Sequence, residues 1–333
     1  MGERVARSLP TMSDPVAQTR LLLHVGYHKT GSSWLQRELF GMRRAWDSGS
    51  AHPRMRQPGA FVAPWSQSDM TRQLVWDHPL SFDPERAREF FSAGIEQAIR
   101  ASRIPVISHE RLSGLPQIGG CDSKEMADRL VSVFPSARIL IVIREQASML
   151  VSLWKGYVQR GGIRSLERFV AQQASPGNLG YLGRHLEYHH MIAYYQRLFG
   201  EESVLVLPFE FLAREPASFV AKLAGFSESP PPSNIDYSRE NRSLSSVAVA
   251  IKRFLNLTVL PVDIDVLPQP RINASLLSLI KVVDQALPSS LSGDREHRRN
   301  ADLREALGRT YAESNQITCK LLGTDLAEYD YEC

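Results

Sequence analysis

The sequence lacks the features that define disulfide-rich, zinc-binding and nucleic-acid-binding proteins. Its three cysteines, Cys121, Cys319 and Cys333, lie far apart and form no CxxC or Cys/His ligand spacing. Such an odd, sparse set argues against a disulfide framework or a zinc site and favours a reducing compartment. The formal net charge is only +3, so the composition indicates no polyanionic partner and we expect no nucleic-acid binding.

Long apolar runs are absent as well. The longest, such as Ile139 to Ile143, are far below the roughly 20 residues that a membrane helix requires. Residues 1–19 contain no apolar core of the length found in signal peptides, and we predict that they form a mobile leader. We therefore expect a cytoplasmic protein with no transmembrane segment. The sequence shows neither internal repeats nor heptads, which leaves the oligomeric state open.

Short β-rich runs, each followed by amphipathic helical sequence, form the main pattern of the chain. This alternation predicts an α/β fold with a P-loop-like central parallel sheet flanked by helices. The runs are Leu21 to Val25, Ile104 to Ser108, Arg138 to Ile143 and Ser203 to Leu207. The helices after them are predicted at Ser32 to Arg43, Ser123 to Phe134, Gln146 to Gln159 and Pro216 to Ala224.

Residues 20–333 are predicted to form a single domain. Within it, residues 42–82 are rich in Pro, Trp, His and Arg, and are too irregular to be a crossover helix alone. We interpret them as an insertion over one face, where insertions often meet substrate. Residues 244–325 are predicted to form a helical C-terminal part, with helices at Val247 to Leu257, Ala274 to Ala286 and Ala301 to Leu322.

The first β-rich run leads into a loop bounded by Gly26 and Gly31. Two glycines separated by four residues let the backbone wrap an anion, and the helix that Ser32 and Ser33 open directs N–H groups and a dipole toward it. A nucleoside triphosphatase would place a lysine directly after the second glycine. Here Ser32 holds that position and the lysine, Lys29, lies inside the loop, where it can reach the bridging oxygen of a leaving group. A glycine pair alone would favour a simple chain turn with a solvated lysine, but the strand before it, the helix after it and the two serines together favour phosphate binding.

A second candidate anion site follows the third run. Arg144 ends this run at the carboxyl edge of the predicted sheet, where open α/β folds bind their ligands. Ser152 lies eight residues later, about two helical turns away, so it can face the same anion only if the chain turns sharply after Arg144.

These residues resemble two motifs of the PAPS-dependent sulfotransferases, where PAPS is 3'-phosphoadenosine 5'-phosphosulfate. Lys29 to Trp34 resembles their 5'-phosphosulfate loop, the fuller stretch from Gly26 to Gln36 resembles a bacterial branch, and Arg144 with Ser152 resembles their 3'-phosphate pair. The likeness extends from about Leu21 to about Asn256. It departs from the family pattern at Glu145-Gln146, where Asn-Pro usually follows the arginine, and this change could alter how the next helix starts.

The resemblance implies a role for each motif residue. The 5'-phosphosulfate would be held by the loop, and the 3'-phosphate by Arg144 and Ser152, with a further contact from Arg239 or Arg242. Trp34 and Phe209 would lie beside the adenine. For Trp34 this contact is compatible with a place in the core, whereas core packing explains Phe209 equally well. The loop residues concerned are Gly26, His28, Lys29, Thr30, Gly31, Ser32 and Ser33, with Lys29 also stabilising the departing oxygen.

The resemblance also implies a base at the end of the second run. Glu110 is our first candidate and His109 the second, and adjacent residues leaving a strand point in different directions, so only one of them should face the acceptor. His28 is a further candidate, although a role in shaping the loop suits it better. In the structural alternative, Glu110 pairs with Arg111 or caps a turn and His109 packs in the core.

The implied function is direct in-line transfer of a sulfuryl group from PAPS to a hydroxyl or amine of a carbohydrate, lipid or small-molecule acceptor, without a metal or a covalent intermediate. Residues 42–82 would lie over the acceptor site. One rival is an ATP-dependent kinase or nucleotide hydrolase on the same loop, which the serine at position 32 disfavours. The other rival is a non-catalytic nucleotide-binding module, against which Lys29 and Glu110 argue.

Overall fold

The structure is a computed structural model that describes residues 20–42, 59–173, 182–232, 235–237, 244–259, 277–282, 284 and 290–333. The predicted leader at 1–19 and the predicted contact residues Arg239 and Arg242 lie outside the described residues, as does part of the 42–82 insertion. No helix in the described part of the chain is both long enough and apolar enough to cross a membrane.

A five-stranded parallel sheet forms the centre of the fold, in the order β2-β3-β1-β4-β5. This confirms the predicted α/β class with a parallel sheet. Each of the four predicted runs lies within one residue of its observed strand, whereas β2, inside the predicted insertion, was not predicted. The strands are β1 Leu22–Gly26, β2 Phe61–Val62, β3 Ile104–Ser108, β4 Arg138–Ile143 and β5 Val204–Pro208.

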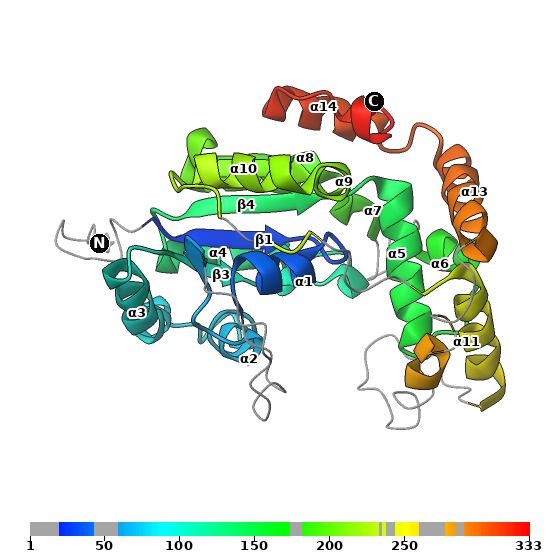
Figure 1. The fold of residues 1–333 in the computed structure, drawn as a ribbon, viewed down its shortest axis with the longest axis horizontal. Helices are drawn as coiled ribbons and strands as arrows, with labels where there is room; N and C mark the ends of the chain where they lie inside the picture. Colours follow the sequence, from blue (N-terminus) through cyan, green and yellow to red (C-terminus); the bar gives the residue numbers. More distant parts are fainter. Residues whose placement is uncertain are drawn as a thin grey trace, which may run out of the picture.

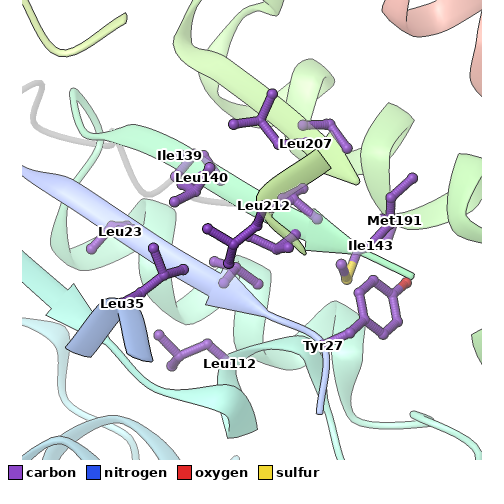
Figure 2. Packing of buried hydrophobic residues seen from close by; sticks show 14 of the residues in the cluster. Leu23, Tyr27, Leu35, Leu112, Ile139, Leu140, Ile143, Met191, Leu207 and Leu212 are labelled. Atoms are coloured by element: carbon purple, nitrogen blue, oxygen red, sulfur yellow. The ribbon is translucent and has the colours of Figure 1, made fainter. Parts of the chain in front are cut away.

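The strands are continuous apolar runs because helices cover both faces of the sheet. Every residue of β1 and β3 is buried. Leu23 of β1 and Ile139 of β4 are register partners, and Figure 2 shows them in one core with Leu35 and Leu212. Tyr27, the first residue after β1, belongs to the same core.

Helices connect the strands (Figure 1). Three of them, α3, α4 and α8, lie side by side, with α3 against β3 and α8 against β4 and β5. Their bounds, with those of the other helices up to residue 226, are α1 Ser32–Trp34, α2 Gln67–Met70, α3 Pro84–Arg100, α4 Ser123–Val133, α5 Gln146–Gln159, α6 Leu166–Gln173, α7 Leu182–His185, α8 Tyr188–Phe199, α9 Phe209–Arg214 and α10 Pro216–Phe226.

The helix predicted at Ser32 to Arg43 is shorter in the structure. The single turn of α1 continues as a π-helical turn, Leu35–Leu39, and the helix ends at Phe40. Gln36 in this turn donates from Nε2 to the Ser108 hydroxyl over 3.1 Å. The segment after the loop is thereby tied to the end of β3, and π-helical turns of this kind are frequent at functional sites.

The predicted helical C-terminal part contains α11 Ser246–Val259, α13 Ser290–Leu307 and α14 Ala312–Leu322. Figure 1 shows α11 and α13 packed on α5 beyond the carboxyl ends of the strands, whereas α14 packs on α8. The single helix predicted from Ala301 to Leu322 was wrong. Gly308 has a φ of +50°, a conformation that favours glycine and ends α13.

The order of the strands shows where the fold can bind a ligand. The chain leaves β1 toward β3 and β2 on one side, and it leaves β4 toward β5 on the other. A reversal of this kind between neighbouring strands marks the ligand-binding edge of open α/β sheets. The predicted phosphate loop follows β1 at this edge, Arg144 follows β4, and His109 and Glu110 follow β3.

Candidate active site

The loop after β1 has a backbone that few sequences can adopt. Lys29 has a φ of +68° and Gly31 a φ of +82°. A Cβ atom on Gly31 would lie 3.0 Å from Leu212 Cδ2 and 3.2 Å from Phe209 Cε2, so a side chain there would crowd both residues in addition to requiring a positive φ. A non-glycine residue in the left-handed region is uncommon and clusters at functional sites. The loop therefore holds Lys29 in a defined, strained position.

Hydroxyl groups in the loop have different environments. The Thr30 side chain is fully buried, and its Oγ1 donates to the Tyr27 carbonyl over 2.6 Å, which closes the loop. Ser32 is buried too, but its Oγ has no hydrogen-bond partner among the described residues. A Cβ on Gly26 would lie 2.7 Å from that oxygen, so this glycine makes room for it. Ser33 is exposed.

Lys29 itself is exposed to solvent and surrounded by other charges. Desolvation by the surrounding protein lowers the pKa of Lys29, with Arg144, Arg160 and Lys155 acting in the same direction, while Glu110 opposes the shift. A lysine among other cations is a stronger acid than a free one and a suitable hydrogen-bond donor to a developing anion.

Arg144 is bound directly to the loop. Its Nη1 donates to the Lys29 carbonyl over 2.9 Å, and its guanidinium lies over the Phe209 ring, 4.7 Å from the centroid. Phe209 thus contacts both Arg144 and the Gly31 position. Ser152 lies on α5, two turns after Arg144, and is buried.

Trp34 makes two contacts with a segment that lies far along the chain. Its Nε1 donates to the Asp236 carbonyl over 3.1 Å, and its ring stacks on Tyr237 with centroids 6.2 Å apart. Tyr237 is 42% exposed, and Trp34 is the last residue of α1. An aromatic pair of this kind offers a flat apolar surface to a planar group.

The two base candidates after β3 have opposite environments. His109 is buried, its Nδ1 accepts the Arg111 N–H over 3.0 Å, and its Nε2 lies 2.9 Å from the Thr71 hydroxyl. Both ring nitrogens are therefore engaged in structural contacts. The Glu110 side chain is 47% exposed, and its Oε1 lies 3.8 Å from His28 Nε2. Glu110 also lies close enough to Lys29 to raise the pKa of that lysine.

His28, a residue of the loop, faces the end of β3, where its Nε2 lies 3.8 Å from Glu110 Oε1. Desolvation lowers its pKa to about 3, and the charges of Arg111, Arg160 and Lys29 act in the same direction, with Asp122 opposing them. The imidazole is therefore neutral at pH 7, and its contact with Glu110 is not an ion pair. Its Nδ1 is buried and without a partner among the described residues.

Two cations on α5 were not predicted from the sequence. Lys155 is almost completely buried, and Arg160 caps the C-terminus of α5. A Cβ on Gly156 would lie 3.6 Å from Arg160 Nη1, so this guanidinium folds back along the helix. Ser152, Gly156 and Arg160 lie four residues apart, and this spacing was the signal available in the sequence for Arg160.

The fold is similar to that of known sulfotransferases. A sulfotransferase from Alicyclobacillus acidocaldarius superposes with a TM-score of 0.52 at 18% sequence identity, over 94% of this chain and 99% of that one. The sulfotransferase domain of the curacin biosynthetic pathway gives 0.38 at 14% identity over 78% of this chain and 98% of that chain. The domain of the Synechococcus PCC 7002 olefin synthase gives 0.35 at 14% identity, over 78% and 94%.

The other comparisons gave no relative. No family model and no curated protein matches the sequence. The likeness to the Alicyclobacillus protein extends over nearly all of both chains, which agrees with the α/β architecture and the parallel sheet seen here. This chain therefore has the sulfotransferase fold.

Proposed function

We propose that this protein is a sulfotransferase that moves the sulfuryl group of PAPS onto a hydroxyl or amine of a carbohydrate, lipid or small-molecule acceptor. The observation that carries the proposal is the grouping of Lys29, Arg144 and Glu110 at one edge of the sheet. Sulfuryl transfer needs a cationic donor at the leaving oxygen, an anchor for the nucleotide and a base for the acceptor. These three residues supply one group each.

The loop residues fit the 5'-phosphosulfate. Ser32 Oγ is a buried hydroxyl with no protein partner in the described part of the chain, and burying such a group is costly unless a ligand completes its hydrogen bonds. The N-terminus of α1 and the glycine at position 31 leave backbone N–H groups for the same anion. Arg144 and Ser152 would hold the 3'-phosphate, and Trp34 with Tyr237 would face the adenine.

The same residues would carry out the transfer in one step. Glu110 accepts the proton of the acceptor hydroxyl, whose oxygen bonds to sulfur while the bond between sulfur and the bridging phosphate oxygen breaks. Lys29 donates a hydrogen bond to that departing oxygen, and adenosine 3',5'-bisphosphate leaves. His109 supports the geometry and does not take the proton, because both its ring nitrogens are engaged.

The rival functions lack a comparable set of residues. A kinase or hydrolase with this loop would need a lysine where Ser32 stands. A non-catalytic nucleotide-binding module would need neither a strained Lys29 nor an exposed carboxylate beside it.

Calorimetric titration without magnesium tests the proposal. Adenosine 3',5'-bisphosphate should bind more tightly than ATP or 5'-AMP, because only the first presents a 3'-phosphate to Arg144. A preference for ATP, or the absence of any binding, would contradict the proposed donor. Once 3'-phosphate-dependent binding is established, labelled PAPS can be used to screen acceptors.

A further inference from the structure

The C-terminal segment brings two cysteines together that lie 14 residues apart. Cys319 is in α14, and Gly323, with a φ of +59°, ends this helix. A 3₁₀ turn at Leu326–Tyr329 and a left-handed residue, Asp330, then turn the chain back. As a result, Sγ of Cys333 lies 3.6 Å from Sγ of Cys319.

A carboxylate joins the two sulfurs. One oxygen of Asp325 and both Sγ atoms lie within 4.8 Å of one another. Asp325 Oδ1 also accepts the Ala327 N–H over 2.9 Å, which fixes the side chain at the start of the 3₁₀ turn. A carboxylate that accepts one backbone hydrogen bond retains the capacity to bind a cation.

The surroundings of the two sulfurs favour a positive ion. The backbone N–H of Leu326 points at Cys319 Sγ over 3.4 Å, an arrangement that stabilises negative charge on sulfur. A bound cation favours the thiolate form of a coordinating cysteine.

We propose that Cys319, Asp325 and Cys333 bind one thiophilic divalent cation such as Zn²⁺, with a water molecule as the fourth ligand. Metal–sulfur bonds of about 2.3 Å in a tetrahedral site place two sulfurs about 3.8 Å apart, and the observed separation of 3.6 Å is close to that value. The residues are a mixed thiolate and carboxylate set, which suits zinc better than magnesium or calcium.

The site would stabilise the C-terminal segment and lies apart from the transfer chemistry. Tyr331 in this segment is buried, and its hydroxyl donates to Glu210 Oε2 over 3.3 Å. Glu210 Oε1 in turn accepts the Glu145 N–H at the start of α5. Asn315 of α14 donates to the Glu332 carbonyl over 2.7 Å. Metal binding would therefore fix the segment whose Tyr331 contacts the start of α5 through Glu210.

Cobalt substitution tests the proposal on the reduced, metal-free protein. One equivalent of Co²⁺ should give thiolate-to-cobalt charge-transfer absorption, and Zn²⁺ should displace it. Cys319→Ser and Cys333→Ser should each weaken binding by more than about 100-fold, since loss of a ligand should exceed the effect of losing an outer-shell contact. Cys121→Ser is the matched control, because Cys121 is exposed and outside the cluster, and it should bind Co²⁺ like the unchanged protein.

Alkylation of the unchanged protein provides a second test that does not depend on how the variants fold. Zn²⁺ should protect Cys319 and Cys333 from iodoacetamide while Cys121 still reacts, as read by mass spectrometry. The proposal is overturned if Co²⁺ gives no charge-transfer absorption, or if this absorption persists in Cys319→Ser. It is equally overturned if Zn²⁺ protects neither thiol and the pair is found only as a disulfide after exposure to a small-molecule disulfide.

Discussion

The ends of β1 and β3 are neighbours in the sheet but are built in different ways. After β1, the backbone determines the geometry, since Lys29 and Gly31 have positive φ values and the Arg144 guanidinium binds the Lys29 carbonyl. After β3, side chains determine it, because His109 binds the Arg111 N–H and the Thr71 hydroxyl. The loop after β1, which we propose binds the anion, is held by its backbone. At the end of β3, the two adjacent residues His109 and Glu110 have different environments.

The different environments of His109 and Glu110, the two candidates for the general base, indicate different roles. His109 is 7% exposed and holds the start of a 3₁₀ turn, Glu110–Ser113. Glu110 follows directly and is left half exposed beside His28. This half-exposed carboxylate, whose contact with His28 is 3.8 Å long, can turn toward an acceptor under the proposed function. The comparison therefore predicts that changes after β1 affect the donor, that Glu110 affects the acceptor, and that His109 affects stability.

The largest effect is expected for Lys29→Ala. Loss of the donor to the leaving oxygen should lower kcat by about 10²- to 10³-fold, with little change in affinity for adenosine 3',5'-bisphosphate. Lys222→Ala, which removes an exposed lysine of α10, is the control and should keep full activity. If turnover is unchanged in Lys29→Ala, Lys29 does not act on the leaving oxygen and the proposed role of the loop after β1 is wrong.

Glu110→Gln should have the next largest effect. Removing a general base typically costs about 10²-fold or more in turnover, and the exposed position of Glu110 should leave the melting temperature unchanged. Turnover should be measured at saturating PAPS, together with nucleotide affinity, which should not change. If His109→Gln lowers turnover more than Glu110→Gln does, the roles of the two residues are reversed.

Arg144→Ala should act on affinity for the nucleotide. A hydrogen-bonded charge of this kind contributes about 1.5–3 kcal/mol, so adenosine 3',5'-bisphosphate should bind about 10- to 100-fold more weakly. Binding of 5'-AMP is the matched control, because it lacks the 3'-phosphate and should change much less. Equal losses for both nucleotides would instead show that Arg144 acts mainly through the loop it holds at the Lys29 carbonyl.

Much of the fold around the loop after β1 could be predicted from the sequence because its signals are local. The strand, the loop and the first helix turn are consecutive, and glycine spacing alone indicates where the backbone must turn. Gln146 to Gln159 was predicted as a helix with the bounds that the structure gives α5. The strand order and the contact between Arg144 and Phe209 depend on chain segments that meet only in three dimensions.

The less predictable parts depend on tertiary contacts. Thr71, inside the predicted insertion, engages His109, and no local pattern connects a residue before β3 with one after it. Tyr237 stacks on Trp34 from about 200 positions away. The pairing of Cys319 with Cys333 requires two left-handed turns, at Gly323 and Asp330, which a spacing of 14 residues does not reveal.

The smallest expected effect is on the pH dependence of folding stability, and it tests whether His109 at the end of β3 has a buried, structural role. Desolvation lowers the pKa of His109 to about 4, below the value near 6.5 expected in the unfolded chain. Between these values the unfolded chain binds more protons, so stability is complete above pH 6.5 and is lost as the pH falls toward 4. At pH 5 this loss amounts to about 2 kcal/mol for one such histidine.

His109→Gln should remove that part of the acid sensitivity while keeping the hydrogen bond to Thr71. The free energy of unfolding is measured in urea at pH 7 and at pH 5. Its decrease between the two pH values should be smaller in the variant than in the unchanged protein. Part of the loss should persist, because desolvation also lowers the pKa of His24 on β1 to about 3. If the two proteins lose the same stability, His109 is protonated equally in the folded and unfolded chains. In that case the end of β3 is not the closed, structural site that separates His109 from Glu110.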